Sequence, residues 1–434
     1  MMKYFLLFVV VSTVAFTSMT CHSPTQPPAD AFTIELADTS CTEAWLNVHL
    51  ASSFRERTVE ITRDTATVMT FTLSQTDTTV SDTGLLPYKT YTYTAHLTNG
   101  TTILKSTAPL HVQTLDTTSN SFSWTTYSLG NGGATSSLYD VAIINDTLAY
   151  AVGEIHYNGT LCNLARWDGK DWQLIKIYFH TICGQSNVTP YPAKSLFAFS
   201  PTKILIAMDG DQVVWWNGHS QTDAMCLPFS FVINKLWGTD SNSVYAVGDG
   251  GNIAHYTAGI WQKIESGTTL NIQDIYGAWN AETKQYEILA VASNPFAQID
   301  KDLLSITPTA VTQLSTDPIP YPIGSTWFIP GRHYYTAGNG IFEKHLLSDV
   351  QWNNNPLDIT SYYIYRITGS DVNDVVAVGG YGECLHFNGK TWKSFYNETH
   401  SSGNYYSVAM RGNLVIAVGQ TTSQGLIAIG KRNP

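Results

Sequence analysis

The sequence predicts an all-β protein in which one β-sandwich is followed by a closed ring of about seven small sheets. Three observations predict this fold class. Short runs of alternating apolar and polar residues fill the segment from about residue 32 to 114. A motif ending in Ala-Val-Gly then recurs along the rest of the chain. The last copy of that motif is incomplete, and a strand that could complete it stands before the first copy.

The composition narrows the class of partner. Of the 434 residues, 43% are hydrophobic and only 13% are charged, about half of the usual ~25% for soluble domains. The net charge is -11, and no stretch gathers the Lys and Arg residues that would neutralise phosphates. We therefore expect no nucleic-acid partner.

The N-terminus has the pattern of a secretory signal, which we assign to residues 1–21. One positive charge, Lys3, precedes a short apolar run from Tyr4 to Phe16, too short for a membrane span. Cys21 stands where a bacterial lipoprotein carries its acylated cysteine, and the Pro-rich residues 22–30 would form a tether. We expect an outer membrane-anchored, periplasmic or cell-surface protein whose lipid at Cys21 is its membrane attachment. Ordinary cleavage nearby would instead release a secreted protein.

The other five cysteines cannot all pair with one another, because their number is odd. Cys162 and Cys183 flank the polar turn 168–171, and closing the loop between them would contribute roughly 3 kcal/mol on the chain-entropy model. We expect this pair to form the disulfide. The sequence contains no Cys/His spacing typical of zinc sites, so we expect no metal and no cofactor.

Residues 31–116 form the predicted sandwich. Apolar residues alternate along Ala44–Leu50 and along Tyr91–Leu97. The turn Leu85-Leu86-Pro87-Tyr88-Lys89-Thr90-Tyr91 resembles the fibronectin type III turn, in which Leu, Pro and Tyr are spaced to return the Tyr hydroxyl onto the preceding backbone. The resemblance covers the whole segment and implies a spacer or docking module.

The repeats span residues 122–434. The clearest copies are Leu236–Gly248 and Ile367–Gly379, each followed by an aromatic residue and a Gly turn into Trp. The remaining copies lie at 149–153, 206–208, 289–292, 335–338 and 416–419. Spacings of roughly 40 to 55 residues match a four-stranded blade, so these seven copies predict a seven-bladed β-propeller. The small residues of Ala-Val-Gly suit sheets packed closely against their neighbours.

The two ends of the repeat region predict how the ring closes. The last copy stops after Ile427–Arg432, before its Trp-bearing fourth strand. The strand Trp124–Leu129 precedes the first copy and matches the fourth strands at Trp261 and Trp392. We expect this N-terminal strand to pair with Ile427–Arg432, which would also cover an exposed sheet edge.

These repeats resemble the YVTN/WD40-like propellers of bacterial secreted proteins over about three quarters of the chain, as in Val244-Tyr245-Ala246-Val247-Gly248. They lack the Gly-His and Trp-Asp pairs of WD40 blades. The resemblance implies an architecture and leaves the activity open, because this fold serves enzymes, scaffolds and binding proteins alike.

No set of residues in the repeats has the pattern of a catalytic site. The loops after the Ala-Val-Gly strands should share one rim of the propeller, where ligands commonly dock. We therefore select as candidate ligand contacts Tyr157, Asp209, Asp249, Tyr381 and Glu383. Ordinary solvated turns would have the same composition.

The sequence thus favours a monomeric, non-catalytic interaction protein of the cell envelope or surface, whose propeller rim binds a protein or a glycan. The alternative is an extracytoplasmic carbohydrate-active enzyme or lyase with its site in the propeller channel. Two buried carboxylates that perturb each other, or a metal cluster in the channel, would favour the enzyme.

Overall fold

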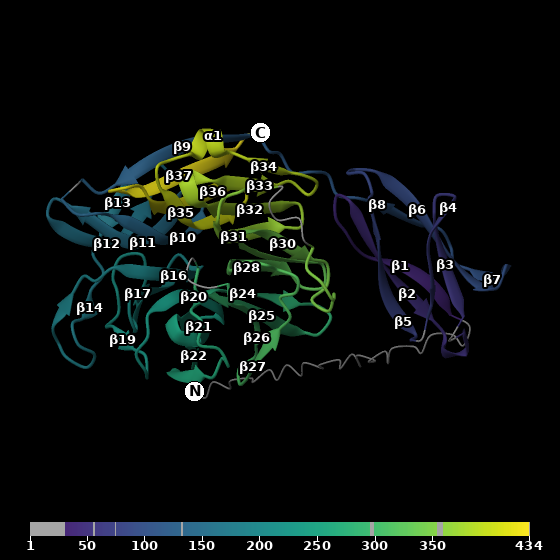
Figure 1. Cartoon of the computed structure of the whole chain (residues 1–434), viewed down its shortest axis with the longest axis horizontal. Coiled ribbons are helices and arrows are strands. Elements are labelled where there is room, and N and C mark those ends of the chain that lie inside the picture. The colour runs from purple at the N-terminus through teal and green to yellow at the C-terminus, as the bar shows by residue number, and fades with distance from the viewer. Residues whose placement is uncertain are drawn as a thin grey trace, which may run out of the picture. The chain divides into compact units, whose positions relative to one another are not determined.

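The computed structural model describes residues 31–433, except 55–56, 74, 132, 296–298 and 354–358. The predicted signal and tether, with Cys21, lie outside the described residues. The chain divides into two compact units, one within residues 31–113 and the other from Thr114 onward with the short segments Ser40–Thr42 and Leu86–Tyr88 (Figure 1). None of the helices among the described residues has the length and apolarity that a membrane crossing needs.

The first unit contains two antiparallel sheets. One has the order β1 (Phe32–Thr39), β2 (Glu43–Leu50), β5 (Asp77–Thr83). The other has the order β4 (Ala66–Thr72), β3 (Thr58–Arg63), β6 (Thr90–Asn99), β7 (Thr102–Ser106), with β8 (Leu110–Gln113) also paired to β6. The predicted alternation is confirmed, because Leu46, Val48, Tyr93 and Ala95 are buried in one apolar core. A short 3-10 helix, η1 (Ser52–Phe54), follows β2.

The described part of the second unit contains seven larger antiparallel sheets, which we number in chain order. Sheet 1 is β10 (Ser137–Asn145), β11 (Leu148–Tyr157), β12 (Thr160–Trp167), β13 (Trp172–Ile175). Sheet 2 is β16 (Ala193–Ser200), β17 (Lys203–Met208), β18 (Gln212–Trp216), β19 (Met225–Cys226). Sheet 3 is β20 (Ile233–Asp240), β21 (Ser243–Gly248), β22 (Ile253–Thr257), β23 (Ile260–Ile264). Sheet 4 is β24 (Ile272–Asn280), β25 (Gln285–Ser293), β26 (Lys301–Ile306), β27 (Val311–Leu314).

Sheet 5 has three strands, and the last two sheets have four. Sheet 5 is β28 (Ile323–Ile329), β29 (His333–Gly338), β30 (Gly340–Lys344). Sheet 6 is β31 (Ile364–Asp371), β32 (Asp374–Gly379), β33 (Cys384–Phe387), β34 (Trp392–Ser394). Sheet 7 is β35 (Asn404–Arg411), β36 (Leu414–Gln420), β37 (Gly425–Arg432), β9 (Phe122–Leu129). The linkers carry the small hairpin β14 (Phe179–His180) and β15 (Val188–Thr189), the 3-10 turns η2 (Asp249–Gly251) and η4 (Gly380–Gly382), and helix α1 (Tyr396–Thr399).

The seven sheets form a closed cycle. The first strand of each sheet lies beside the first strand of the next, and β35 of sheet 7 lies beside β10 of sheet 1 (Figure 1). An apolar cluster lies between every two successive sheets, including sheets 7 and 1. The first strands therefore surround a central channel, and burial of the clusters on both faces of each sheet holds the cycle together.

The predicted pairing of the two ends is confirmed. Strand β9 forms the fourth strand of sheet 7 antiparallel to β37, with Tyr127 opposite Ile427 and Trp124 opposite Gly430. The Trp124 ring also lies 5.3 Å from the ring of Phe395. A strand that precedes the first sheet thus completes the last one, which is the arrangement that the unmatched Trp strand predicts.

The glycine of Ala-Val-Gly has a different role from the one expected. A Cβ on Gly248 would lie 1.9 Å from the carbonyl oxygen of Val232, at the start of the first strand of the same sheet. The glycines at 153, 338, 379 and 419 would meet the equivalent carbonyl oxygens at 1.9–2.3 Å. The close approach is thus between two strands of one sheet and not between neighbouring sheets, and only a residue without Cβ fits there.

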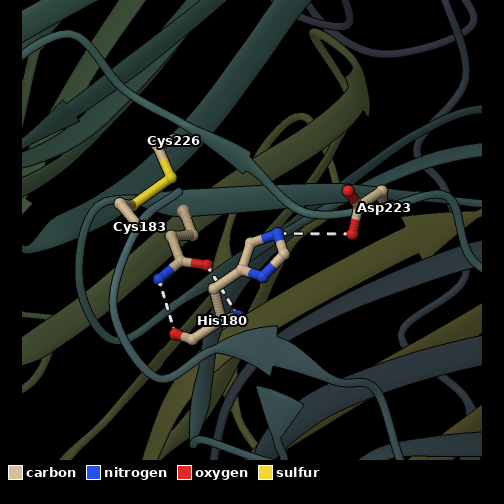
Figure 2. Close-up of a disulfide and its surroundings, with 5 residues drawn as sticks. His180, Cys183, Asp223 and Cys226 are labelled. Atoms are coloured by element: carbon tan, nitrogen blue, oxygen red, sulfur yellow. Dashed lines mark hydrogen bonds and ion pairs between the residues drawn. A yellow bond between two sulfur atoms is a disulfide. The ribbon is translucent and has the colours of Figure 1, made fainter. Parts of the chain in front are cut away.

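The disulfide differs from the expected Cys162–Cys183 pair. Cys183 is bonded to Cys226, and Cys162 is a buried free thiol (Figure 2). The β14–β15 hairpin lies against sheet 2, where Gln212 accepts a hydrogen bond from the His180 backbone N–H and donates one to its carbonyl, both at 2.9 Å. The hairpin therefore brings Cys183 to β19, while Cys162 is buried in the cluster between sheets 1 and 7. Loop-closure entropy alone does not distinguish these partners.

Candidate functional site at the channel mouth

A β-bulge recurs at the same place in the first strand of all seven sheets. Each first strand shifts register against its second strand after its first one or two paired residues. A bulge leaves one residue unpaired and re-aims its side chain. The seven bulged residues are Tyr139, Lys194, Asn234, Gln273, Gly324, Tyr365 and Tyr406. All seven line one cavity of about 270 Å³ at the channel mouth, together with Pro295, Tyr363, Arg366 and Gln420.

Tyrosines form one side of this mouth pocket. The rings of Tyr139 and Tyr406 are stacked with centroids 6.4 Å apart, and Tyr365 meets Tyr406 edge-on at 5.2 Å. Tyr363 meets Tyr365 edge-on at 4.9 Å. Burial raises the pKa of both Tyr139 and Tyr365, so these hydroxyls stay protonated and can donate hydrogen bonds at neutral pH.

Two amides and one cation complete the wall. The Asn234 side-chain nitrogen donates to the Asp249 carboxylate at 2.9 Å and to the Ile272 carbonyl at 3.1 Å. The Gln273 side-chain nitrogen donates to the Ser293 carbonyl at 2.8 Å. These bonds use both N–H groups of Asn234 and one of Gln273, so the two side chains offer their oxygens as acceptors and one Gln273 N–H as a donor to a ligand. Lys194 Nζ lies 4.3 Å above the Tyr139 ring, within the range of a cation–π interaction.

The residue after each bulge contributes to a polar layer that forms the floor of the pocket. In order around the channel these residues are Asp140, Ser195, Lys235, Asp274, Ser325, Arg366 and Ser407. On the other side of this floor a second cavity of about 280 Å³ is lined by the first strands, with Lys235, Asp274 and Arg366 among its lining residues. We call the seven residues the channel floor.

The charges of the channel floor are paired. Asp140 accepts hydrogen bonds from Lys235 Nζ at 2.7 Å, Ser195 Oγ at 2.8 Å and Ser407 Oγ at 2.7 Å. Asp274 accepts from Arg366 Nη1 and from Ser325 Oγ. Both carboxylates are buried, and each has a cation and at least one hydroxyl as partners. Arg366 Nε has no hydrogen-bond partner among the described residues, whereas each carboxylate is held by several donors, and these bonds fix the geometry of the two carboxylates.

This pairing bears on the enzymatic alternative. Burial by itself would raise the pKa of Asp140, but the charges of Lys235 and Arg366, with the hydrogen bonds, outweigh burial and hold that pKa below its ordinary value. Asp140 is therefore ionised at neutral pH and is not a general acid. Asp140 and Asp274 are each matched to a cation, unlike a catalytic carboxylate pair whose like charges perturb each other.

None of the five candidate contacts chosen from the sequence lines the mouth pocket. Tyr157 lies at the β11–β12 turn and is half exposed, and Asp209 is exposed at the end of β17. Tyr381 lies in η4 with 61% of its surface exposed, and its ring is 5.3 Å from that of Tyr362. These three side chains face solvent in the loops that follow the second strands.

The other two candidates are bound by neighbouring side chains. Asp249 accepts the hydrogen bond from Asn234, which brings it next to the wall of the mouth pocket. Glu383 is buried and accepts hydrogen bonds from Thr360 Oγ1 at 2.9 Å and Ser394 Oγ at 2.6 Å. The sequence did not point to the pocket residues because the repeated Ala-Val-Gly motif, from which the candidates were chosen, lies in the second strands. Aligning the first strands would have revealed a varied position directly before the floor residue.

Comparisons with known proteins show similarity at the level of the fold. No family model matches the chain, and no curated protein matches it in sequence. A solved structure of YCF48 bound to D1 peptide is similar with a TM-score of 0.54 and 16% identity, covering 72% of this chain and 95% of that one. YCF48 from Cyanidioschyzon merolae has a TM-score of 0.48 and 15% identity, covering 70% and 98%. The WD40 beta propeller domain of Doa1 has a TM-score of 0.49 and 14% identity, covering 71% and 96%. The chain is thus an all-β protein whose second unit has the β-propeller fold.

Proposed function

We propose that this chain is a non-catalytic binding protein whose mouth pocket receives a segment of a partner protein. In this proposal the seven sheets are the blades of one seven-bladed propeller, and the first unit is a fibronectin type III-like spacer. A fold alone does not define a function, so the proposal depends on the chemistry of the pocket.

The observation that carries the proposal is the convergence of seven bulged residues on one pocket. Tyrosine hydroxyls and one ammonium group can donate, the amide oxygens can accept, and the tyrosine rings supply apolar contact. A peptide segment presents the complementary backbone donors and acceptors together with side chains. A neighbour with the same fold has been solved with a peptide bound, which is consistent with this class of ligand.

The channel floor supports a ligand that lies in the mouth over one that passes through the channel. Its paired charges and hydroxyls cross the channel directly beneath the bulged residues. A glycan is the other ligand that the tyrosine rings could accept, and the experiment below separates it from a peptide.

We also propose that the protein is exported and anchored at the cell envelope through a lipid at Cys21. Metabolic labelling with a palmitate analogue should mark the full-length protein, and Cys21→Ser should abolish the label. Equal labelling of both forms would contradict the anchor and leave the binding proposal unaffected.

The binding proposal can be tested by selecting random linear dodecapeptides on the full chain. Peptides that bind the mouth should lose affinity by about tenfold or more with Tyr365→Ala or Tyr406→Ala, because buried aromatic anchors carry much of the energy of an interface. Tyr157→Ala and Tyr381→Ala are the controls, since both residues are exposed outside the pocket. Thermal unfolding of each variant verifies that it is folded.

Two outcomes would contradict the binding proposal. The first is selected peptides that bind the Tyr365 and Tyr406 variants as tightly as the unaltered chain, or no selected peptides at all. The second is a glycan array in which binding depends on the same tyrosines, which would identify the ligand as a glycan.

A further inference from the structure

We propose that the segment received by the mouth pocket carries a carboxylate, which pairs with Lys194. This inference rests on the proposed function and adds the chemistry of the ligand to it. It depends on the charges of the pocket, the donors beside Lys194, and the way the amides are held.

The charged side chains that line the mouth pocket are both positive, in a chain whose net charge is -11. Two charged side chains line it, Lys194 and Arg366. Arg366 is neutralised by Asp274 of the channel floor, so the remaining charge is that of Lys194. Among the described residues no carboxylate forms an ion pair with Lys194, whose ammonium group lies over the Tyr139 ring instead. An ammonium group held over a ring at a pocket wall can still pair with an anion on its open side.

Two carboxylates act electrostatically on Tyr139, the ring beneath Lys194, and neither lines the pocket. Glu154 lies 2.8 Å from His156 Nε2 and forms a pair with it. Asp209 is exposed at the end of β17. Burial is the main cause of the raised pKa of Tyr139, and both carboxylates add to it. They make the surroundings of the mouth acidic and so weaken the attraction of Lys194 for any anion, which the other contacts of a bound carboxylate must offset.

The hydroxyls near Lys194 are suited to a carboxylate. A carboxylate only accepts hydrogen bonds, and its strongest partners are cations and protonated hydroxyls. The Tyr406 ring is stacked on the Tyr139 ring that carries Lys194, and the Tyr365 ring meets Tyr406 edge-on. All three residues line the pocket. Among the described residues no hydrogen bond engages the hydroxyls of Tyr365 and Tyr406, which leaves them as donors for a ligand.

The amides favour a peptide over an acidic sugar as the source of the carboxylate. Sugar hydroxyls both donate and accept, so an amide that binds them well offers its oxygen and its nitrogen. Here the nitrogens of Asn234 and Gln273 are bonded within the protein. One N–H of Gln273 and both oxygens remain, so the two amides offer mainly acceptors, and these match the backbone N–H groups of a peptide, which only donate.

The test uses two peptide libraries displayed against the full chain, one ending in a free carboxylate and one with the random segment internal. We expect selected peptides to be enriched in Asp or Glu, or to come only from the library with free C-termini. The two results distinguish a side-chain carboxylate from a terminal one. Binding of a selected synthetic peptide should weaken by about tenfold or more with Lys194→Gln, and Lys194→Arg should retain most of the affinity.

A matched control is available in Lys203. Its ammonium group lies 4.0 Å from the Trp215 ring, the same kind of contact as Lys194 makes, and it does not line the mouth. Lys203→Gln should leave peptide affinity unchanged. Replacing the peptide carboxylate by an amide should weaken binding to the unaltered chain and have a much smaller effect on the Lys194→Gln variant, where only the tyrosine hydroxyls still meet the carboxylate. Raising the salt concentration from 50 to 300 mM should weaken binding only between the unaltered chain and the peptide that keeps its carboxylate. The loss of affinity should match the screening expected for about one ion pair.

Two results would overturn this inference and leave the proposed function intact. In the first, peptides depend on Tyr365 and Tyr406 for binding but show no preference for acidic groups. In the second, Lys194→Gln leaves the affinity of the selected peptides unchanged. If no peptide depends on those tyrosines, both fail. Binding of uronic acid glycans that depends on Lys194 would confirm an anion site and overturn the peptide as its ligand.

Discussion

Lys235 donates to both carboxylate oxygens of Asp140 at 2.7 Å, although sheet 2 stands between their sheets in the ring. Ser195 of that intervening sheet donates to the same carboxylate at 2.8 Å. One buried group therefore joins the first strands of sheets 1, 2 and 3 across the channel, and Ser407 adds sheet 7. The channel floor therefore connects sheets across the ring, and it also forms the base of the mouth pocket.

Removing the Lys235 cation from the channel floor should destabilise the folded protein. Lys235→Met leaves Asp140 buried with only hydroxyls and backbone as partners, and breaking a buried pair in this way costs about 3–5 kcal/mol. We expect a large loss in the free energy of unfolding, measured by denaturant titration. The double variant Lys235→Met with Asp140→Asn should recover part of the loss, because it removes the unpaired charge. If Lys235→Met lowers the free energy of unfolding by less than about 0.5 kcal/mol, the channel floor does not stabilise the ring as described.

Stability should fall in acid. The pKa of Asp140 lies below its ordinary value, and the pKa of Asp374 is also lowered, because hydrogen bonds from His386 and Arg432 outweigh its burial. A carboxyl with a depressed folded pKa contributes stability above the unfolded value of about 4 and loses it as the pH falls toward the folded value. The melting temperature should therefore decline below about pH 4. The melting temperature of the Asp140→Asn, Lys235→Met variant should decline less steeply with falling pH. A melting temperature of the unaltered protein that stays constant between pH 5 and 3 would refute the prediction.

The packing of the closing strand can be tested at Gly430. A Cβ there would lie 2.7 Å from the Trp124 ring, so Gly430→Ala forces the ring to move. Overpacking of this kind costs about 1–3 kcal/mol. In a Trp124→Ala background the same substitution should cost far less, because the atoms that it meets are gone. Equal costs in both backgrounds, measured by calorimetry, would show that the two residues do not pack as described.

The glycine of the repeated motif should be irreplaceable for a local reason. Gly248→Ala would place a methyl group 1.9 Å from the Val232 carbonyl oxygen, and we expect a loss of about 3 kcal/mol or more. Gly259→Ala is the matched control, because its positive φ costs about 1–2 kcal/mol while no atom lies within 4 Å of the new Cβ. Melting temperatures should rank the two variants in that order, and a reversed order would exclude the close approach as the cause.

The disulfide can be tested by peptide mapping. Mass spectrometry of the unreduced exported protein should find the Cys183 peptide linked to the Cys226 peptide, 43 residues apart in sequence. Closing such a loop contributes about 4 kcal/mol on the chain-entropy model. Replacing both cysteines by Ser should lower the melting temperature, and Cys162→Ser should leave the linked peptide intact. Recovery of a Cys162–Cys183 peptide would contradict the structure.

The sequence by itself determined the repeats and their closure. Alternation and the Ala-Val-Gly motif are local patterns, so the strands of sheets 3 and 6 could be placed without coordinates. The unmatched strand at Trp124 was sufficient to predict the pairing of β9 with β37. These inferences needed only the spacing of residues within a repeat and the comparison of one repeat with another.

Only the tertiary structure decided where the candidate site lies. A bulge shifts register by one residue, and alternation along a single strand does not reveal it because register belongs to a pair of strands. The mouth pocket takes one side chain from each of seven sheets, and Asp140 finds its cation in Lys235, ninety-five residues away. The partner of Cys183 was decided in the same way, by a hairpin that packs against sheet 2. Contacts between residues far apart in sequence depend on how the ring closes, and this is the information that local patterns lack.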